Sequence, residues 1–304
     1  MDFKKQARLS RLRNVLSGNH IAWGSVRQIN QGFYGYVYLV EHDGKHLIAK
    51  VYKQDGCMER EAQQLEMLRK YALVRVPEII AELPRNSNGH FDILLMEHLP
   101  GVNAGEIKIM DEARKNRFAD DVIDNLLAIH AVTSYEGFGD YVTGEFQPSW
   151  EEYYHSLITP MHRALMDSKI NRKIAGLADE LYERFAQFFS SPVRESHLIH
   201  GDYNLWNLMV DPQTERLTGM IDPFGSCFAD RELELFQLEN SNGNLYHLLQ
   251  NYAKKVPLSN QFEAKKYYYR FWDDVKHYLN VGYCDKKAFL RCGGKALELL
   301  KSLM

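Results

Sequence analysis

The chain contains the stretch HGDYNLWNLMVD at residues 200–211 and the stretch LTGMIDP at residues 217–223. Residues 208–210 and 217–221 are mostly apolar, and the segment DPQTER between them is typical of a turn. This order predicts an antiparallel hairpin that folds about residues 214 and 215. In such a hairpin, the residue that enters the first strand faces the residue that leaves the second strand. Two polar side chains at the open end of the hairpin are therefore expected to lie side by side.

Those two side chains are Asn207 and Asp222, and Asp202 precedes them on the loop that leads into the hairpin. An amide oxygen beside a carboxylate is the hard oxygen site that Mg²⁺ prefers, with phosphate and water completing the octahedron. A second carboxylate nearby can accept a proton from a hydroxyl nucleophile. Single Asp and Asn residues in loops are usually turn formers or helix caps. The ordered set of three, with a hairpin between its members, favours the chemical interpretation.

The first hundred residues are rich in strand signals. Alternating or clustered β-branched and aromatic residues predict strands at 25–30, 36–40, 46–52, 78–83 and 91–96. Asp43-Gly44 predicts a two-residue hairpin turn, and Asn88-Gly89 lies at a second turn. Residues 56–70 have the spacing of an amphipathic helix. We therefore predict a five-stranded antiparallel sheet with one helix.

A linker-like Leu99-Pro100-Gly101 separates this part from a mainly helical remainder. Helical patterns extend over residues 111–132, 150–165, 171–189, 231–255, 262–279 and 286–303. Strands followed by helices predict an α+β protein in two lobes, with a cleft near residue 99. The expected domains are residues 1–98 and 99–304.

Composition excludes several classes of protein. The 304 residues are 45% hydrophobic and 12% aromatic, as in globular proteins. We find neither the roughly 20 apolar residues of a membrane helix nor the apolar segment of a secretory signal. The four cysteines are scattered without a CxxC pair, which argues against zinc and disulfides and fits a reducing cytoplasm. A net charge of −3 argues against a nucleic-acid binder. Together these features lead us to expect a cytoplasmic protein with no nucleic-acid or membrane partner.

The pattern HGDxxxxN, followed by an apolar hairpin and Ile221-Asp222, resembles the catalytic segment of the aminoglycoside-phosphotransferase, choline-kinase and fructosamine-kinase superfamily. That superfamily is similar in fold to protein kinases. The resemblance implies that Asp202 is the catalytic base and that Asn207 and Asp222 bind Mg²⁺. His200 matches a residue that shapes the loop, with a general base as the alternative.

Other positions fit the same family. Gly32 and Gly35 lie between two predicted strands, where a kinase loop covers the phosphates of ATP, although a plain hairpin turn is the alternative. Lys50 matches the lysine that contacts the α- and β-phosphates, with Glu61 as its ion-pair partner. The segment 95–99 resembles the hinge that binds adenine, so Glu97 and Leu99 are candidate nucleotide-binding residues. His130 matches a family motif and is expected to be structural.

The implied function is ATP-dependent transfer of a phosphoryl group to a hydroxyl of a small molecule, such as a sugar, a fructosamine-like adduct, an amino sugar or an amino alcohol. Residues 1–98 would bind the nucleotide, and residues 99–304 would hold the catalytic loop and the acceptor. Pro223, Glu232 and Glu234 favour the fructosamine-kinase branch. A protein kinase is disfavoured because the loop reads HGD rather than HRD and no APE-like segment follows. A non-catalytic nucleotide-binding protein is disfavoured because every catalytic position holds a competent side chain.

The basic residues are unevenly distributed. Residues 1–20 sum to +4 and residues 244–304 to +6, so the remainder is strongly acidic. In the family that the chain resembles, the C-terminal segment walls the acceptor pocket. A basic wall disfavours a polycationic acceptor and favours a neutral, singly charged or anionic one. The alternative is that these lysines lie on a solvated outer face.

Overall fold

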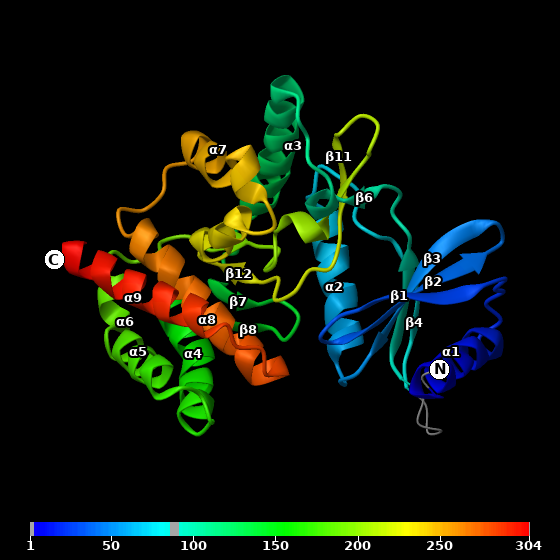
Figure 1. Ribbon diagram of the computed structural model, residues 1–304, viewed down its shortest axis with the longest axis horizontal. Helices are drawn as coiled ribbons and strands as arrows, with labels where there is room; N and C mark the ends of the chain where they lie inside the picture. Colours follow the sequence, from blue (N-terminus) through cyan, green and yellow to red (C-terminus); the bar gives the residue numbers. More distant parts are fainter. Residues whose placement is uncertain (1–2, 86–90, 304) are drawn as a thin grey trace.

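The computed structural model describes residues 3–85 and 91–303, and Figure 1 shows its two lobes side by side. The smaller lobe contains a five-stranded antiparallel sheet with the strand order β1-β2-β3-β5-β4. The strands are β1 (Val26–Gln31), β2 (Gly35–His42), β3 (Lys45–Tyr52), β4 (Ile79–Leu83) and β5 (Ile93–Glu97). The predicted α+β fold with its antiparallel sheet is confirmed. The domain boundary between residues 98 and 99 stays a prediction.

Turn chemistry fixes the register of this sheet. Asp43 and Gly44 have φ values of +46° and +74°, as a tight hairpin of this kind requires. The hairpin pairs Val37 with Lys50, in the middle of β3. Strand β5 lies on the other side of β3 and pairs Leu94 with Lys50. Lys50 is thus carried on a central strand. The turn expected at residues 88–89 lies outside the described residues.

Two helices pack on this lobe. Helix α2 (Cys57–Arg69) follows β3, as predicted, and it lies between the sheet and the larger lobe in Figure 1. The structure adds a helix that the sequence analysis did not include, α1 (Phe3–Gly18). Its apolar side is narrow, but Leu12 and Leu16 are buried against the sheet. Arg8 also stacks over the Tyr36 ring, at 4.0 Å from the ring centroid, which explains how so basic a helix can pack on a sheet.

The larger lobe is mainly helical. Its helices are α3 (Glu112–His130), α4 (Trp150–Met166), α5 (Arg172–Glu183), α6 (Phe185–Phe188), α7 (Leu248–Lys255), α8 (Phe262–Val281) and α9 (Lys286–Leu303). Short 3₁₀ segments lie at Ala104–Glu106, Leu205–Asn207, Arg231–Glu239 and Gly243–Tyr246. Of the helices in the described part of the chain, none is long and apolar enough to cross a membrane.

Two of the expected helices are interrupted. The pattern at 171–189 is divided into α5 and α6 at Arg184. The pattern at 231–255 forms two 3₁₀ segments and only then α7. Asn242 and His247 have positive φ values, and a Cβ at Gly243 would meet the carbonyl oxygen of Leu238 at 2.0 Å. A continuous α-helix is incompatible with this backbone path.

Small sheets hold the functional loops on the helical lobe. One sheet has the order β11-β10-β6 and another has the order β8-β7-β12-β9. Their strands are β6 (Val102–Asn103), β7 (Phe138–Asp140), β8 (Glu145–Gln147), β9 (His197–Leu198), β10 (Leu208–Val210), β11 (Leu217–Met220) and β12 (Phe228–Ala229).

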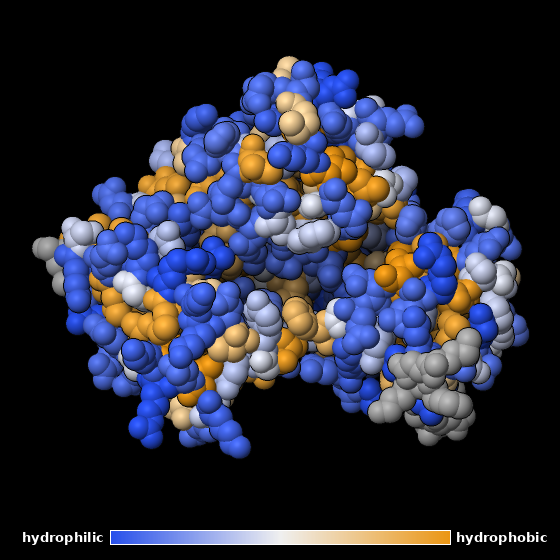
Figure 2. Space-filling model, viewed as in Figure 1, coloured by the Kyte–Doolittle hydropathy of each residue, from blue (hydrophilic) through white to orange (hydrophobic). Residues whose placement is uncertain are grey.

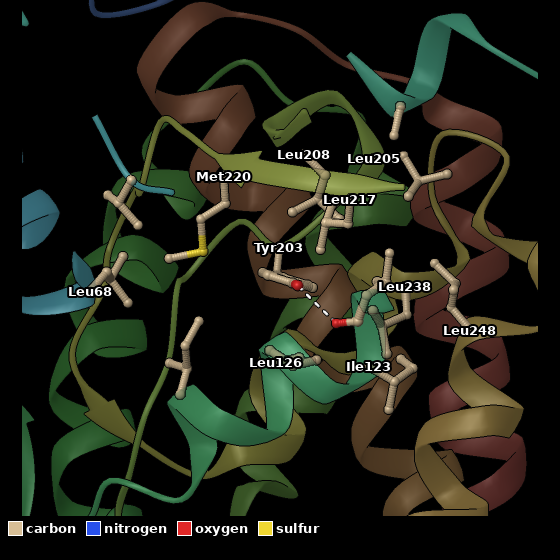
Figure 3. Close-up of a cluster of buried hydrophobic side chains, with 14 of the residues drawn as sticks. Leu68, Ile123, Leu126, Tyr203, Leu205, Leu208, Leu217, Met220, Leu238 and Leu248 are labelled. Atoms are coloured by element: carbon tan, nitrogen blue, oxygen red, sulfur yellow. Dashed lines mark hydrogen bonds between the residues drawn. The ribbon is translucent and has the colours of Figure 1, made fainter. Parts of the chain in front are cut away.

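A hydrophobic cluster lies beneath the β10–β11 hairpin (Figure 3). Leu208 and Met220 of the hairpin belong to the same cluster as Leu126 of α3, and all three are fully buried. Tyr203, on the loop before the hairpin, is also fully buried, and its hydroxyl donates to the carbonyl oxygen of Val122 at 2.9 Å. Dense packing of this kind resists displacement, so the loop that carries Asp202 is anchored at its next residue.

Candidate active site

The β10–β11 hairpin brings the predicted polar residues together. Leu208 pairs with Met220, and the amide of Ile221 donates to the carbonyl oxygen of Asn207 at 2.9 Å. Asn207 therefore lies opposite Ile221, one residue from the pairing with Asp222 that the sequence predicts. Asp222 has a φ of +57°, an unusual conformation for a residue other than glycine, and it turns the chain out of the strand.

Asp202 is held by two amide side chains. Asn207 Nδ2 donates to Asp202 Oδ2 at 2.8 Å, and Asn204 Nδ2 donates to Asp202 Oδ1 at 2.8 Å. The amide nitrogen of Asn207 thus points to Asp202, and its Oδ1 is the atom left to face a cation. Burial raises the pKa of Asp202, although the nearby His200 and the hydrogen bond from Asn207 oppose the rise.

Lys50 joins the two lobes. Its Nζ lies 2.6 Å from Glu61 Oε2 on α2 and 2.5 Å from Asp222 Oδ1 on the larger lobe. Burial disfavours the positive charge of Lys50. Attraction to Asp222 and Glu61 outweighs the effect of burial and raises the pKa of Lys50. Lys50 likewise outweighs enclosure at Asp222 and lowers the pKa of that carboxyl. Tyr52 completes the cluster by donating to Glu61 Oε2 at 2.8 Å.

His200 has both ring nitrogens engaged. Its Nδ1 accepts from the amide of Asp202 at 3.3 Å, so its Nε2 carries the proton and donates to the carbonyl oxygen of Ile221 at 3.2 Å. Burial lowers the pKa of His200, despite the nearby carboxylate of Glu234. A fully buried imidazole that bonds the backbone on both sides supports the loop-shaping role rather than the general base.

Glu234 anchors the same loop. Its Oε1 accepts from His130 Nε2 at 2.8 Å and from the amide of His200 at 3.2 Å, and its Oε2 accepts from the amide of Gly201 at 2.8 Å. The remaining nitrogen of His130 accepts from the Tyr252 hydroxyl at 2.8 Å. His130 is therefore buried and satisfied, as its expected structural role requires.

A cavity of about 240 Å³ opens beside the catalytic loop, and the surface is hollowed between the two lobes in Figure 2. Aromatic side chains from α4 and α8 form much of its wall. Its lining includes Tyr153, Gly201, Phe224, Trp272, Asp273 and Lys276. Gly201, the residue before Asp202, is part of this lining.

The loop between β1 and β2 reaches the larger lobe. Tyr34 stacks on Phe224 with ring centroids 4.4 Å apart, and its hydroxyl accepts from Asn280 Nδ2 of α8 at 2.9 Å. A Cβ at Gly35 would meet the carbonyl oxygen of Val51 at 2.6 Å, so glycine there is required by packing against β3. Gly32 has open space around its Cα. A phosphate-covering role for the two glycines stays a prediction.

The expected adenine hinge follows β5. The amide of Glu97 donates to the carbonyl oxygen of Glu78 at 2.8 Å, and its carboxylate pairs with Arg75. The amide of Glu97 is therefore occupied within the sheet. Leu99 is buried, with its side chain against Gly219 of β11. Adenine binding at Glu97 and Leu99 stays a prediction.

A sequence model of the phosphotransferase enzyme family (APH) matches residues 25–244, which is most of the chain. The chain belongs to the phosphotransferase enzyme family. The resemblance read from HGDxxxxN and Ile221-Asp222 is thereby confirmed. Uncharacterized protein YcbJ of Escherichia coli K12 is 26% identical over 252 residues, which cover 80% of this chain and 82% of that protein.

Solved structures show the same fold at low identity. Aminoglycoside phosphotransferase APH(4)-Ia has a TM-score of 0.75 at 15% identity, with 97% of this chain and 99% of that one covered. A candidate fructosamine-3-kinase from Haemophilus somnus 129PT has a TM-score of 0.72 at 16% identity, with 98% and 100% covered. The predicted protein-kinase-like fold is therefore confirmed.

Some residues of this candidate site could not be identified from the sequence. Glu234 was noted as a mark of one branch, whereas its carboxylate accepts from the amides of His200 and Gly201 on the loop that carries Asp202. Tyr34 and Lys276 were not identified, because their places depend on how α8 crosses the cleft. Aromatic residues beside a glycine, as in Gly32-Phe33-Tyr34-Gly35, were the available signal for Tyr34.

Proposed function

We propose that this member of the phosphotransferase enzyme family transfers the γ-phosphoryl group of ATP to a hydroxyl of a small molecule, such as a sugar, a fructosamine-like adduct, an amino sugar or an amino alcohol. The observation that carries the proposal is the position of Asp202. Its carboxylate is oriented by Asn204 and Asn207, and it follows Gly201, which lines the cavity, on the loop that leads into the hairpin before Asp222. Aminoglycoside phosphotransferase APH(4)-Ia, which shares the fold, has been solved with ADP and hygromycin B.

The nucleotide side of the site is assigned to the smaller lobe. Lys50 would contact the α- and β-phosphates, and Glu61 holds it in place at 2.6 Å. The loop with Gly32 and Gly35 would cover the phosphates, and the backbone near Glu97 and Leu99 would bind adenine. On this proposal residues 1–98 bind the nucleotide, and residues 99–304 hold the catalytic loop and the acceptor.

Residues at the open end of the hairpin would hold a magnesium ion together with the nucleotide phosphates. Lys50 occupies Asp222 Oδ1, which leaves Oδ2 and Asn207 Oδ1 as hard oxygen donors. No group of three or more His, Cys, Asp or Glu side chains within residues 3–85 and 91–303 could hold a metal ion. The nucleotide phosphates would therefore complete the shell. Bound there, Mg²⁺ would neutralise charge on the phosphates.

Asp202 would accept the proton of the acceptor hydroxyl. A base works in its ionised form, and burial raises the pKa of Asp202 above its ordinary value. The rate of transfer is therefore expected to rise with pH as this carboxyl ionises. The same rise would be absent from a variant that lacks the carboxyl.

Most charged side chains at the cavity are already paired with protein groups, and this pairing bears on the charge of the acceptor. Of the eleven basic residues in 244–304, Lys276 lines the cavity, whereas Lys265 and Lys266 are buried in ion pairs. The carboxylates of the cavity are engaged by protein groups: Asp140 by Arg60, Glu234 by His130 and Asp273 by Lys276. A polycationic acceptor would have to break such pairs. A compact acceptor with few positive charges is still expected, now from pairing within the cavity.

The deciding experiment combines binding with an acceptor screen. Thermal shift with ATP and Mg²⁺ is expected to show stabilisation, and ADP release is then measured over candidate acceptors. Asp202→Asn is expected to lower kcat by at least about 10²-fold with little change in nucleotide affinity, because it removes a transition-state interaction.

Asp211→Asn is the matched control. Asp211 lies in the turn of the same hairpin and accepts from the amides of Gln213 and Thr214, outside the cavity. It is expected to keep normal turnover. A loss of ATP affinity without a loss of kcat in Asp202→Asn would make Asp202 a binding residue. Phosphorylation of a protein but of no small molecule would favour the protein-kinase alternative, and binding without turnover would favour the non-catalytic one.

A further inference from the structure

Helix α8 lies outside the part of the chain that the family model matches, yet it forms one wall of the cavity. Asp273, Lys276 and Asn280 recur at spacings of three and four residues, so they share one face of the helix. Asp273 and Lys276 line the cavity, and Asn280 binds Tyr34 of the smaller lobe. This face of α8 therefore looks onto the place where the two lobes meet.

Lys276 occupies the inner part of that face. Its Nζ lies 5.3 Å from the centroid of the Phe224 ring. Phe224 comes two residues after Asp222 in the chain. Tyr34, on the loop between β1 and β2, stacks on the same ring. Lys276 and Tyr34 thus both contact the Phe224 ring, close to the point where the chain leaves the hairpin.

Asp273 holds Lys276 in its charged form. The carboxylate Oδ1 lies 2.5 Å from Nζ. Burial opposes the charge, but Asp273 outweighs it and raises the pKa of Lys276, with a further contribution from Asp202.

The other cations near the site have different tasks. Lys50 is bound between Glu61 and Asp222, and Arg60 is paired with Asp140 at another part of the wall. The catalytic stretch HGDYNLWN contains neither lysine nor arginine. In the described part of the chain, the cations that line the cavity are Arg60 and Lys276. Lys276 is the one that lies over the Phe224 ring, close to Asp222 in the chain.

A phosphoryl group in transfer spreads negative charge over its equatorial oxygens, and a positioned lysine stabilises that charge. Asp202 and Asp273 on the acceptor side would repel it. We propose, on the basis of the function proposed above, that Lys276 is a catalytic residue whose ammonium contacts the transferring phosphoryl group from the acceptor side. The bond from the γ-phosphorus to the β–γ bridging oxygen breaks, and a bond to the acceptor oxygen forms. The hydroxyl proton goes to Asp202, and Lys276 keeps its protons throughout.

The test uses Lys276→Met, which removes the charge and keeps most of the stem. The Lys276 side chain is about a third exposed, so the fold is expected to tolerate the change. Lys295→Met is the matched control, because Lys295 makes an ion pair with Glu298 at 2.7 Å on α9, also three residues apart, outside the cavity lining. Lys276→Arg restores a positive charge in case the methionine variant is poorly folded.

Two readouts avoid the need to know the acceptor. The first is single-turnover hydrolysis of MgATP, in which water replaces the acceptor hydroxyl. The second is the gain in MgADP affinity when aluminium fluoride, a mimic of the transferring phosphoryl group, is added. Lys276→Met is expected to slow hydrolysis by about 10²-fold, the usual effect of losing one such donor. It is also expected to lose most of the gain from aluminium fluoride, with unchanged affinity for MgADP alone.

The outcomes separate this inference from the proposed function. Wild-type protein that binds neither MgATP nor MgADP would overturn both. Wild-type protein that hydrolyses MgATP, together with a Lys276→Met variant that matches it in both readouts, would overturn this inference alone. A partial recovery in Lys276→Arg and no change in Lys295→Met would support it.

Discussion

Lys50 and Lys265 each lie between two carboxylates at nearly the same distances. Lys50 Nζ is 2.6 Å from Glu61 and 2.5 Å from Asp222, and Lys265 Nζ is 2.5 Å from Asp230 and 2.7 Å from Glu232. In both cases attraction to the two carboxylates outweighs burial and raises the pKa of the lysine. Ion-pair geometry alone therefore does not distinguish them.

The carboxylates differ in what else they bind. Asp230 also accepts from the Tyr269 hydroxyl at 2.7 Å, and Glu232 accepts from the amide and hydroxyl of Ser259 at 2.6 and 2.7 Å. All three side chains of that cluster are at most 5% exposed. The Asp222 side chain is 53% exposed and uses one oxygen for Lys50.

The clusters thus differ in whether every carboxylate oxygen has a hydrogen-bond or ion-pair partner in the protein. This difference separates a structural cluster from a reactive one. A carboxylate whose oxygens are all satisfied by protein can only hold the fold together. A carboxylate with an open oxygen at the edge of a cavity can bind a cation or a ligand. The following predictions test this distinction.

The largest expected effect is on catalysis at the cluster of Lys50, Glu61 and Asp222, called the open cluster because one Asp222 oxygen has no protein partner among the described residues. Asp222→Ala is expected to abolish phosphoryl transfer and to weaken sharply the Mg²⁺ dependence of nucleotide binding. The fold is expected to remain intact, because this side chain is half exposed. Titration of ATP with and without Mg²⁺, alongside circular dichroism, measures both effects. Near-normal turnover in this variant would remove Asp222 from the site.

The next largest effect is on stability at the cluster of Lys265, Asp230 and Glu232, the closed cluster. Lys265→Met leaves Asp230 and Glu232 buried without their cation, so the free energy of unfolding is expected to fall by about 3–5 kcal/mol. Urea denaturation followed by tryptophan fluorescence measures the change. Lys50→Met is the matched variant, and its loss is expected to be smaller because water can reach Asp222. Equal losses in the two variants would contradict the distinction.

These clusters also show what the sequence can predict. Asp202 and Asn207 were expected to lie close together, and they do, whereas Asn207 lies opposite Ile221 rather than Asp222 because the predicted hairpin register is one residue off. Lys50 was expected beside Glu61, and its contact with Asp222 joins the two lobes over 172 residues. The register of β2 and β3 follows from the short polar turn between these apolar strands. Contacts set by neighbouring strands are readable in this way.

Contacts between distant helices are not readable in the same way. The net charge of +6 over residues 244–304 predicted a basic surface that includes Lys265 and Lys266. Both lysines are instead buried in ion pairs. The pattern at 231–255 was expected to be one helix, and Glu232 and Glu234 were noted only for their likeness to one branch of the family. Both are buried, and each satisfies groups far away in sequence. Pairing across the lobe is decided by packing that no local pattern encodes.

The smallest expected effect is a coupling within the open cluster. Lys50→Ala and Glu61→Ala are each expected to impair kcat/KM, and the double variant is expected to cost less than the sum of the two. Glu61 Oε2 contacts both Lys50 and the Tyr52 hydroxyl, so its contribution to catalysis acts through the position of Lys50. Once Lys50 is absent, removal of Glu61 has little left to change.

The interaction energy in this cycle is expected to be about 0.5–3 kcal/mol of activation free energy, the range for residues in direct contact. The corresponding cycle at Lys265 and Glu232 is the control. That pair is expected to couple in the free energy of unfolding, because both charges are buried, and to show no coupling in kcat/KM of the folded protein. Additive losses at Lys50 and Glu61 would show that the two side chains do not act as a unit. Coupling in kcat/KM at Lys265 and Glu232 would show that the closed cluster can still contribute to catalysis.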